Sequence, residues 1–146
     1  MAKKQRKSKN LINKKASFDY QFLESLETGL VLTGEEIKAI RANKVNLSGS
    51  HIKIIGGEAF WVGGIINVVI GDQQRTRKLL MHKEEIQRIS GKSEEKGLTI
   101  IPKKIYLKHG KAKLEIALSR GKKLHDKREE IKKRDLERDA ARSIKY

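Results

Sequence analysis

The chain of 146 residues contains no cysteine, one proline and no long apolar run. Without cysteine it forms no disulfide, has no thiolate-ligated zinc and offers no cysteine nucleophile. The longest apolar stretch, residues 59–70, falls well short of the roughly 20 residues that a membrane-spanning helix needs. The N-terminus is basic and lacks the apolar segment of a signal peptide. We therefore expect a single domain in the cytoplasm, with no membrane as its partner.

Motifs that indicate an enzyme are also missing. The sequence has no dinucleotide-binding glycine fingerprint, no P-loop and no HExxH zinc motif, so we expect no catalysis, no metal and no cofactor. Two pairs of adjacent glutamates, residues 35–36 and 84–85, fall in the first turns of expected helices, where acids interact favourably with the helix dipole. We interpret both pairs as solvated helix caps. Among the four histidines we single out His125, because it lies in a run of lysine and arginine.

Positive charge dominates the composition and is concentrated at the two ends of the chain. The formal net charge is +16. Residues 1–15 carry seven Lys/Arg and no acid, and residues 120–146 carry 11 Lys/Arg against six Asp/Glu. A moderately basic body between two basic arms is the distribution expected of a nucleic-acid binder. A membrane-surface protein is the rival class, but neither arm has the apolar face that an interfacial helix needs.

The C-terminal segment, residues 120–146, has the charge spacing of a helix but no core-forming face. Acids precede bases by three or four positions, as in Glu130 before Arg134 and Asp135 before Arg138, which places opposite charges side by side. Apolar residues are sparse, so such a helix is marginal alone in water. The segment is either a solvated, frayed tail or a basic arm that folds when a polyanion neutralises it.

Short alternating segments and glycine turns predict a mainly β body. The alternation of Phe18, Tyr20 and Phe22 indicates the first strand. Gly56-Gly57 indicates a hairpin, since both residues accept positive φ. Six or seven short strands with two to three short helices predict a small, closed, antiparallel β-barrel.

Four local features refine this expectation. They are a turn at residues 27–29, a capping box of Thr33 and Glu36, a continuation of the sheet over residues 65–70 after a bend at the preceding glycine pair, and a strand edge or bulge at Pro102.

A second basic cluster consists of Arg75, Arg77 and Lys78. If this segment is extended, Arg75 and Arg77 point the same way and are placed to grip two phosphates. A solvated strand end has the same composition, so the alternative stays open. Tyr20 or Trp61 is available to stack on an exposed base, although a core position for Trp61 fits its apolar neighbours equally well.

Several blocks of this sequence, in order, resemble the SmpB family, whose members bind transfer-messenger RNA (tmRNA) in bacterial ribosome rescue. The matching blocks run nearly from residue 13 to the C-terminus and are NKKA at 13–16, GEEIKAIRANKVNL at 34–47, RTRKLLMHKEEI at 75–86, EKGLTIIP at 95–102 and GKKLHDKRE at 121–129.

Residues 1–15 have no periodicity, and we expect them to form a mobile N-terminal arm. The resemblance implies an OB-like barrel over residues 16–119 that binds the tRNA-like domain of tmRNA. It implies that the tail, residues 120–146, is disordered when free and becomes helical in the empty messenger channel of a stalled 70S ribosome, with residues 125–128 at or beside the decoding centre. Delivery with elongation factor Tu and a monomeric state are further expectations.

The resemblance also implies which residues carry these contacts. The family's RNA-contacting positions, together with Lys14 and the basic cluster, give an expected tmRNA site of Asn13, Lys14, Tyr20, Glu27, Arg75, Arg77, Lys78, Leu80 and Lys113. The residues expected to contact the ribosome are Gly121, Lys122, Lys123, His125, Asp126, Lys127, Arg128 and Ile144.

Glu27 is an acid at a proposed RNA surface, so we expect it to accept hydrogen bonds from a base or ribose, or to orient a basic residue such as Lys14. The chain departs from the family in a shorter loop between Ile66 and Arg75 and in Ser143-Ile144, where the family has two adjacent apolar residues. The alternative function is a ribosomal structural or assembly protein that coats rRNA, which would not need the decoding-centre segment.

Overall fold

The computed structural model describes the backbone of residues 11–144 and the side chains of residues 11–123 and 127–138. Most of the expected N-terminal arm lies outside this range, and its last residues belong to the first strand and helix. The elements in chain order are β1 (Leu11–Ile12), α1 (Lys14–Asp19), β2 (Tyr20–Leu30), α2 (Gly34–Arg41), β3 (Val45–Asn46), β4 (His51–Ile55), β5 (Glu58–Val62), β6 (Ile65–Ile66), β7 (Arg77–Leu80), α3 (Lys83–Lys96), β8 (Thr99–Lys108), β9 (Lys111–Gly121) and α4 (Leu124–Ile144).

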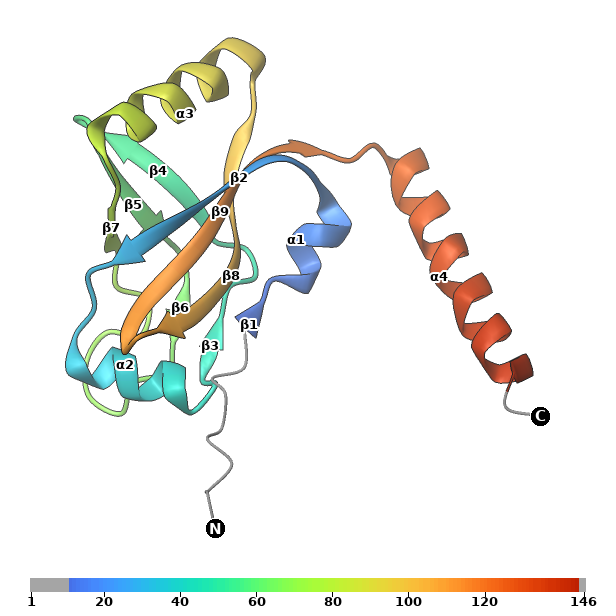
Figure 1. Ribbon diagram of the computed structural model, residues 1–146, viewed down its shortest axis with the longest axis horizontal. Helices are drawn as coiled ribbons and strands as arrows, with labels where there is room; N and C mark the ends of the chain where they lie inside the picture. Colours follow the sequence, from blue (N-terminus) through green and yellow to red (C-terminus); the bar gives the residue numbers. More distant parts are fainter. Residues whose placement is uncertain (1–10, 145–146) are drawn as a thin grey trace.

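Seven strands form one antiparallel sheet in the order β1-β8-β9-β2-β7-β5-β4, and β3 pairs with β6 separately. The long strands β2, β8 and β9 cross the middle of the body, with α3 at one end and α2 at the other (Figure 1).

The mainly β prediction is confirmed. The sheet is not closed, however, because β4 lies near β8 without a hydrogen-bonded ladder between them in the described structure. Within residues 11–144 there are four helices rather than two to three.

The start of the first expected strand is a helix instead. Lys14–Asp19 forms α1 because the Asn13 side chain accepts a hydrogen bond from the Ala16 amide (3.1 Å), an N-cap that the alternating aromatic residues conceal. Strand β2 begins only at Tyr20 and runs through residues 27–29, where the sequence predicts a turn. That prediction is wrong because these residues are fully paired with β9.

A glycine pair takes the chain out of the main sheet after β5. A Cβ on Gly64 would lie 2.0 Å from the Trp61 ring, so only glycine fits there. Beyond it, β6 is two residues long and pairs with β3, so the prediction that residues 65–70 continue the sheet is wrong. The hairpin at residues 56–57 and the bulge at Pro102, where the β8–β9 register shifts, are confirmed.

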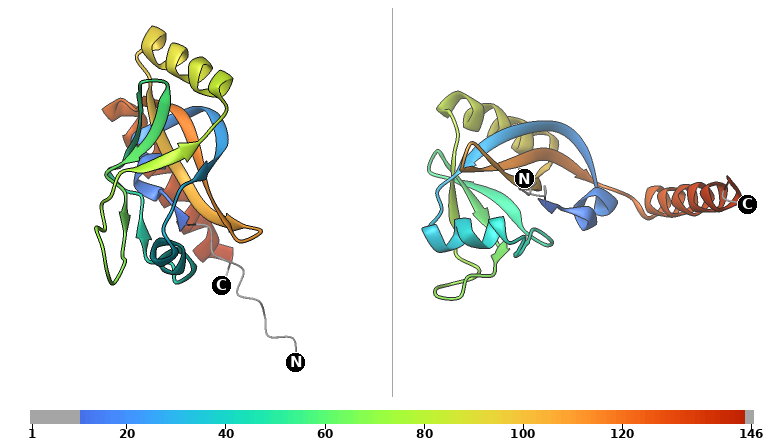
Figure 2. Two further views of the ribbon diagram at one scale, coloured as in Figure 1. Left: turned by 90° about the vertical axis from the view of Figure 1, so that its left-hand side faces the viewer. Right: turned by 60° about the horizontal axis from the view of Figure 1, so that its bottom comes forward.

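The hydrophobic core lies between the curved sheet and the helices that cover its ends. Trp61, Ile66, Ile105 and Leu114 are fully buried there, which settles Trp61 as a core residue. Helix α4 leaves this body after β9 and projects away from it, with its first turns beside α1 (Figure 2). No helix within residues 11–144 is both long enough and apolar enough to cross a membrane.

Candidate nucleic-acid interface

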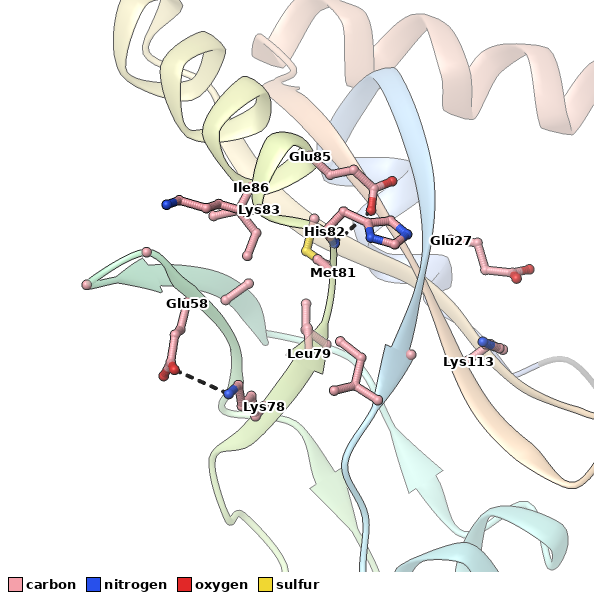
Figure 3. A pocket seen from close by; sticks show the side chains of 15 residues that line it. Glu27, Glu58, Lys78, Leu79, Met81, His82, Lys83, Glu85, Ile86 and Lys113 are labelled. Atoms are coloured by element: carbon pink, nitrogen blue, oxygen red, sulfur yellow. Dashed lines mark hydrogen bonds and ion pairs between the residues drawn. The ribbon is translucent and has the colours of Figure 1, made fainter.

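A groove of about 800 Å³ runs from the β4–β5 turn past the end of β7 and the start of α3 to β2 and β9 (Figure 3). Leu80 of β7 and Lys113 of β9 both lie opposite Gly29 of β2. Glu27 lies two residues before Gly29 on β2, and all four residues line the groove. Strand register therefore brings four of the expected RNA-contacting side chains to one site, namely Glu27, Leu80, Lys113 and Lys78.

Leu80 is exposed for two reasons. Side chains along β7 point alternately inward and outward, and the neighbouring Gly29 has no side chain to cover it. Along β7, Arg77 and Leu79 point inward whereas Lys78 and Leu80 point outward. A Cβ on Gly29 would lie 3.2 Å from the Leu80 Cβ, so a larger residue would push Leu80 aside. Leu80 is 57% exposed and offers an apolar contact to the face of a base.

Glu27 is held in place by residues of β8. The Tyr106 hydroxyl donates a hydrogen bond to its carboxylate, and Lys108 Nζ lies 3.8 Å from the other oxygen. The hydrogen bond from Tyr106 lowers the pKa of Glu27, while burial and this same contact raise the pKa of Tyr106. Glu27 is thus an oriented, charged acceptor whose partners are Tyr106 and Lys108, and not Lys14.

The groove carries both signs of charge. Lys78 of β7 pairs with Glu58 of the neighbouring strand β5 at 3.2 Å, and Glu85 accepts a hydrogen bond from the His82 amide at the start of α3. Such a surface offers donors and acceptors to base edges and sugars as well as cations to phosphates. Its charged residues are Lys78, Lys83, Lys113, Glu27, Glu58 and Glu85.

Arg75 and Arg77 do point the same way, but toward a buried carboxylate. The Arg77 guanidinium is 0% exposed, lies 2.6 Å from Glu36 Oε2 and stacks at 5.1 Å over Trp61. The prediction that Arg77 grips a phosphate is therefore wrong, because solvent and ligands do not reach it. Arg75 lies 2.5 Å from Glu36 Oε1 but keeps 39% of its side chain exposed, so its phosphate contact stays a prediction.

The interpretation of the glutamates at residues 35–36 as solvated helix caps is wrong for Glu36. The capping box with Thr33 is confirmed, since each residue accepts a hydrogen bond from the other's amide. Yet Glu36 is only 2% exposed. Burial by itself raises the pKa of Glu36, but hydrogen bonds from Arg75, the Thr33 amide and Arg77 outweigh it and lower that pKa from 4.5 to about 2.

Acid is expected to destabilise the fold through Glu36. Because its pKa is lower in the folded than in the unfolded chain, its contribution is complete above about pH 5 and is lost as the pH falls from the unfolded value of 4.5 toward 2. The depression corresponds to about 3 kcal/mol of unfolding free energy. Urea unfolding at pH 7, 5, 4 and 3 measures this loss, and a Glu36→Gln variant should show a correspondingly shallower dependence. An equally steep dependence in that variant would assign the effect to other carboxylates.

Asn13 and Tyr20 lie away from the groove, beside a smaller pocket of about 310 Å³ near the start of β2. Asn13 is 3% exposed, and its Nδ2 donates to the carbonyl oxygens of Pro102 (2.9 Å) and Leu47 (3.3 Å). It is a structural clamp for α1, so its predicted direct contact with RNA is not supported by this geometry. Tyr20 is partly exposed and Lys14 is exposed, and their RNA contacts stay predictions.

The tail residues fall into three groups. Gly121 ends β9 opposite Tyr20, and Lys122 and Lys127 contact α1. Lys123 and Arg128 are exposed. The side chains of His125, Asp126 and Ile144 lie outside the described residues, and the expected folding of the tail on the ribosome stays a prediction.

Sequence reasoning missed Tyr106, which does not line the groove but holds one of its residues in place, and also the lining residues Glu58, Lys83 and Glu85. The Tyr106 hydroxyl orients Glu27, although the two residues are 79 positions apart. The only available signal for Tyr106 was its place in an alternating strand with lysines around it, which equally fits an ordinary surface tyrosine.

An antiparallel β body with a mixed-charge groove and a basic helical tail defines a class of nucleic-acid-binding proteins. A family model described as "SmpB protein" matches residues 10–146, and the chain belongs to the SmpB family. It is 49% identical over 144 residues to the SsrA-binding protein of Acaryochloris marina and 51% identical over 141 residues to that of Helicobacter hepaticus, with 91% of each chain covered in both cases.

A solved structure shares the fold. It is described as "tmRNA-SmpB: a journey to the center of the bacterial ribosome" and has a TM-score of 0.68 and 42% sequence identity, covering 79% of this chain and 85% of that chain. The resemblance to the SmpB family inferred from the sequence blocks is confirmed.

Proposed function

We propose that this chain binds the tRNA-like domain of tmRNA through the groove between β2, β7 and β9, and that its tail enters the empty messenger channel of a stalled ribosome. The observation that carries this proposal is the convergence of Leu80, Glu27 and Lys113 from three strands on one groove. The similarity to SsrA-binding proteins and to a tmRNA–SmpB structure supports the choice of RNA. The mechanism is positioning, without catalysis: the protein places tmRNA in the decoding site so that the stalled peptide is transferred and tagged.

Further elements belong to the same proposal. The body acts as an OB-like barrel in which β4 lies close to β8 without a hydrogen-bonded ladder between them. The protein works as a cytoplasmic monomer and is delivered with elongation factor Tu. Arg75, Lys78 and Lys14 supply phosphate contacts around the groove and α1.

Comparison of two RNAs at one salt concentration tests the proposal. The isolated tRNA-like domain of tmRNA should bind more tightly than an ordinary tRNA, because groove contacts to bases and sugars add to the phosphate attraction that both RNAs share. Equal affinity would leave only non-specific basic binding. Stoichiometric binding to all ribosomes, stalled or not, would instead favour an rRNA coat protein.

Glu27→Ala is expected to reduce selectivity while sparing general RNA affinity. Loss of an oriented charged acceptor should weaken binding of the tRNA-like domain by about tenfold, since hydrogen bonds to charged groups contribute about 1.5–3 kcal/mol. Removal of a negative charge should slightly strengthen tRNA binding. Filter binding of both RNAs to each variant measures the ratio of the affinity for the tRNA-like domain to the affinity for tRNA. Glu94→Ala, an exposed acid on α3, is the matched control and should shift both RNAs equally. If Glu27→Ala strengthened the binding of both RNAs by the same factor, Glu27 would have no role in selectivity.

The salt dependence of binding is expected to identify which cations meet phosphates. Each phosphate contact contributes about 0.7–0.9 to the slope of log affinity against log salt. Lys113→Ala should therefore lower the slope by about that amount, whereas Lys53→Ala, an exposed lysine of β4, should not. Arg77→Ala should lower protein stability instead, because its guanidinium is buried. A slope that fell equally for Lys113 and Lys53 would indicate diffuse attraction without defined contacts.

A further inference from the structure

Two charged residues of the groove share one face of the sheet with Tyr106. Strand register sets their order. Glu27 of β2 lies opposite Glu115 of β9, and Lys113, two residues before Glu115, lies opposite Tyr106 of β8. Residues two positions apart, and residues directly opposite each other, point to the same face of a sheet, so all four side chains share it. Tyr106 therefore reaches Glu27 along a diagonal that crosses β9 between Lys113 and Glu115.

Residues of β8 bind both acids on this face. Glu115 pairs with Lys103 at 3.0 Å and with Lys104 at 3.5 Å. Glu27 takes both of its partners from the same strand. Within the described part of the chain, no ion pair joins Lys113 to either acid. The ammonium group of Lys113 is therefore available to a ligand, although two carboxylates lie on the same face.

The Tyr106 hydroxyl is the main contact that holds Glu27 toward β8. Its hydrogen bond contributes more to the lowered pKa of Glu27 than the attraction of Lys108 or Lys113 does. Burial and the same hydrogen bond raise the pKa of Tyr106, so the hydroxyl stays protonated and remains a donor. The Lys104 ammonium lies 5.6 Å from the centroid of the Tyr106 ring and steadies it.

Lys113 is the competing partner for Glu27. It is the diagonal neighbour of Glu27 across the β2–β9 pair, and long side chains of opposite charge reach each other at such positions. An ion pair between them would withdraw both groups from RNA, because it would have to break before either group met a ligand. The groove offers two separate charges only while Glu27 is held elsewhere.

We propose that Tyr106 is a positioning residue for RNA selectivity, which holds Glu27 toward β8 and keeps it from pairing with Lys113. The groove then presents a separate hydrogen-bond acceptor and a separate cation. The inference rests on the proposed binding of the tRNA-like domain in this groove. An ordinary tRNA meets the cation through its phosphates, whereas the tRNA-like domain also donates hydrogen bonds to the acceptor. Tyr106 acts through Glu27 and needs no contact with RNA.

Crystal structures without RNA test the positioning directly. Tyr106→Phe keeps the ring and removes only the hydroxyl. In the parent, Glu27 should contact Tyr106, and in the variant its carboxylate should turn to within about 4 Å of Lys113 Nζ, the range of an ion pair. A carboxylate that kept its parent position in the variant would overturn the proposal.

RNA binding tests the consequence for selectivity. Tyr106→Phe should weaken binding of the tRNA-like domain by about fivefold and change binding of an ordinary tRNA by less than about twofold. In a Glu27→Ala background the same substitution should change neither affinity by more than about twofold, because the hydroxyl acts only through Glu27. An equal loss in both backgrounds would overturn the proposal, since Tyr106 would then act independently of Glu27.

Ser25→Ala is the matched control. It removes a hydroxyl from the same strand as Glu27, one that accepts a hydrogen bond from Lys103 at 3.1 Å and makes none with Glu27. Both affinities and the urea midpoint should stay at the parent values, and Tyr106→Phe should also keep that midpoint. An equal loss of selectivity in the two variants would overturn the specific role of Tyr106.

The two kinds of measurement separate this inference from the proposed function. If the parent showed no preference for the tRNA-like domain over tRNA, the proposed function would fail. The crystal structures would still decide whether Tyr106 keeps Glu27 from Lys113.

Discussion

Replacement of Glu36 by glutamine is expected to lower the free energy of unfolding by about 3–5 kcal/mol at pH 7, a large part of the 5–15 kcal/mol typical of a domain. The substitution keeps the shape of the side chain but removes the charge that compensates Arg77, which is 0% exposed. Arg75 loses its partner as well. Urea denaturation followed by circular dichroism measures the change.

The neighbouring glutamate provides the control. Glu35 pairs with Lys38 at 3.5 Å, and their side chains are 49% and 74% exposed. Glu35→Gln should therefore cost less than about 1 kcal/mol, as exposed ion pairs do. Similar losses in the two variants would mean that the buried network does not stabilise the fold as its geometry indicates. A Glu36→Gln variant as stable as the parent would lead to the same conclusion about the buried network.

A chain that ends at Lys123 is expected to bind the tRNA-like domain of tmRNA within about twofold of the parent affinity and to support no peptide tagging. This prediction rests on the proposed function. The groove residues all precede the cut, and the cut preserves the pairing of Gly121 with Tyr20 and the Lys122 contacts with α1. Truncation at residue 119 would remove these contacts. The contacts of Lys127 and Arg134 with α1 are lost, so the unfolding free energy should fall by no more than about 1–2 kcal/mol.

Competition distinguishes a binding-competent truncated chain from a damaged one. Added in excess, the chain ending at Lys123 should inhibit tagging by the full-length protein, because it occupies tmRNA without placing a helix in the messenger channel. Restoration of tagging by the truncated chain alone would refute the division of labour between body and tail. A large loss of tmRNA affinity would show that α4 belongs to the RNA-binding module.

Local chemistry made several features predictable from the sequence alone. The glycines at 56–57 specify a hairpin and the Thr33–Glu36 pair specifies a helix start, because each depends on atoms a few residues apart. The charge spacing after residue 120 indicates a helix for the same reason. The concentration of positive charge at the two ends, and with it a polyanionic partner, follows from counting alone.

The groove and the buried network were decided only by tertiary structure. The alternation along this segment correctly predicts that Arg75 and Arg77 point to the same side. Whether that side faces solvent or Glu36 depends on how β7 packs against α2, because Glu36 is 41 residues away from Arg77. The exposed position of Leu80 depended on the register of β7 with Gly29. The contact of Tyr106 with Glu27 depended on a β8–β9–β2 arrangement. Such pairs are fixed by strand register and sheet order, which arise from the packing of the whole core and leave no signature in the spacing of nearby residues.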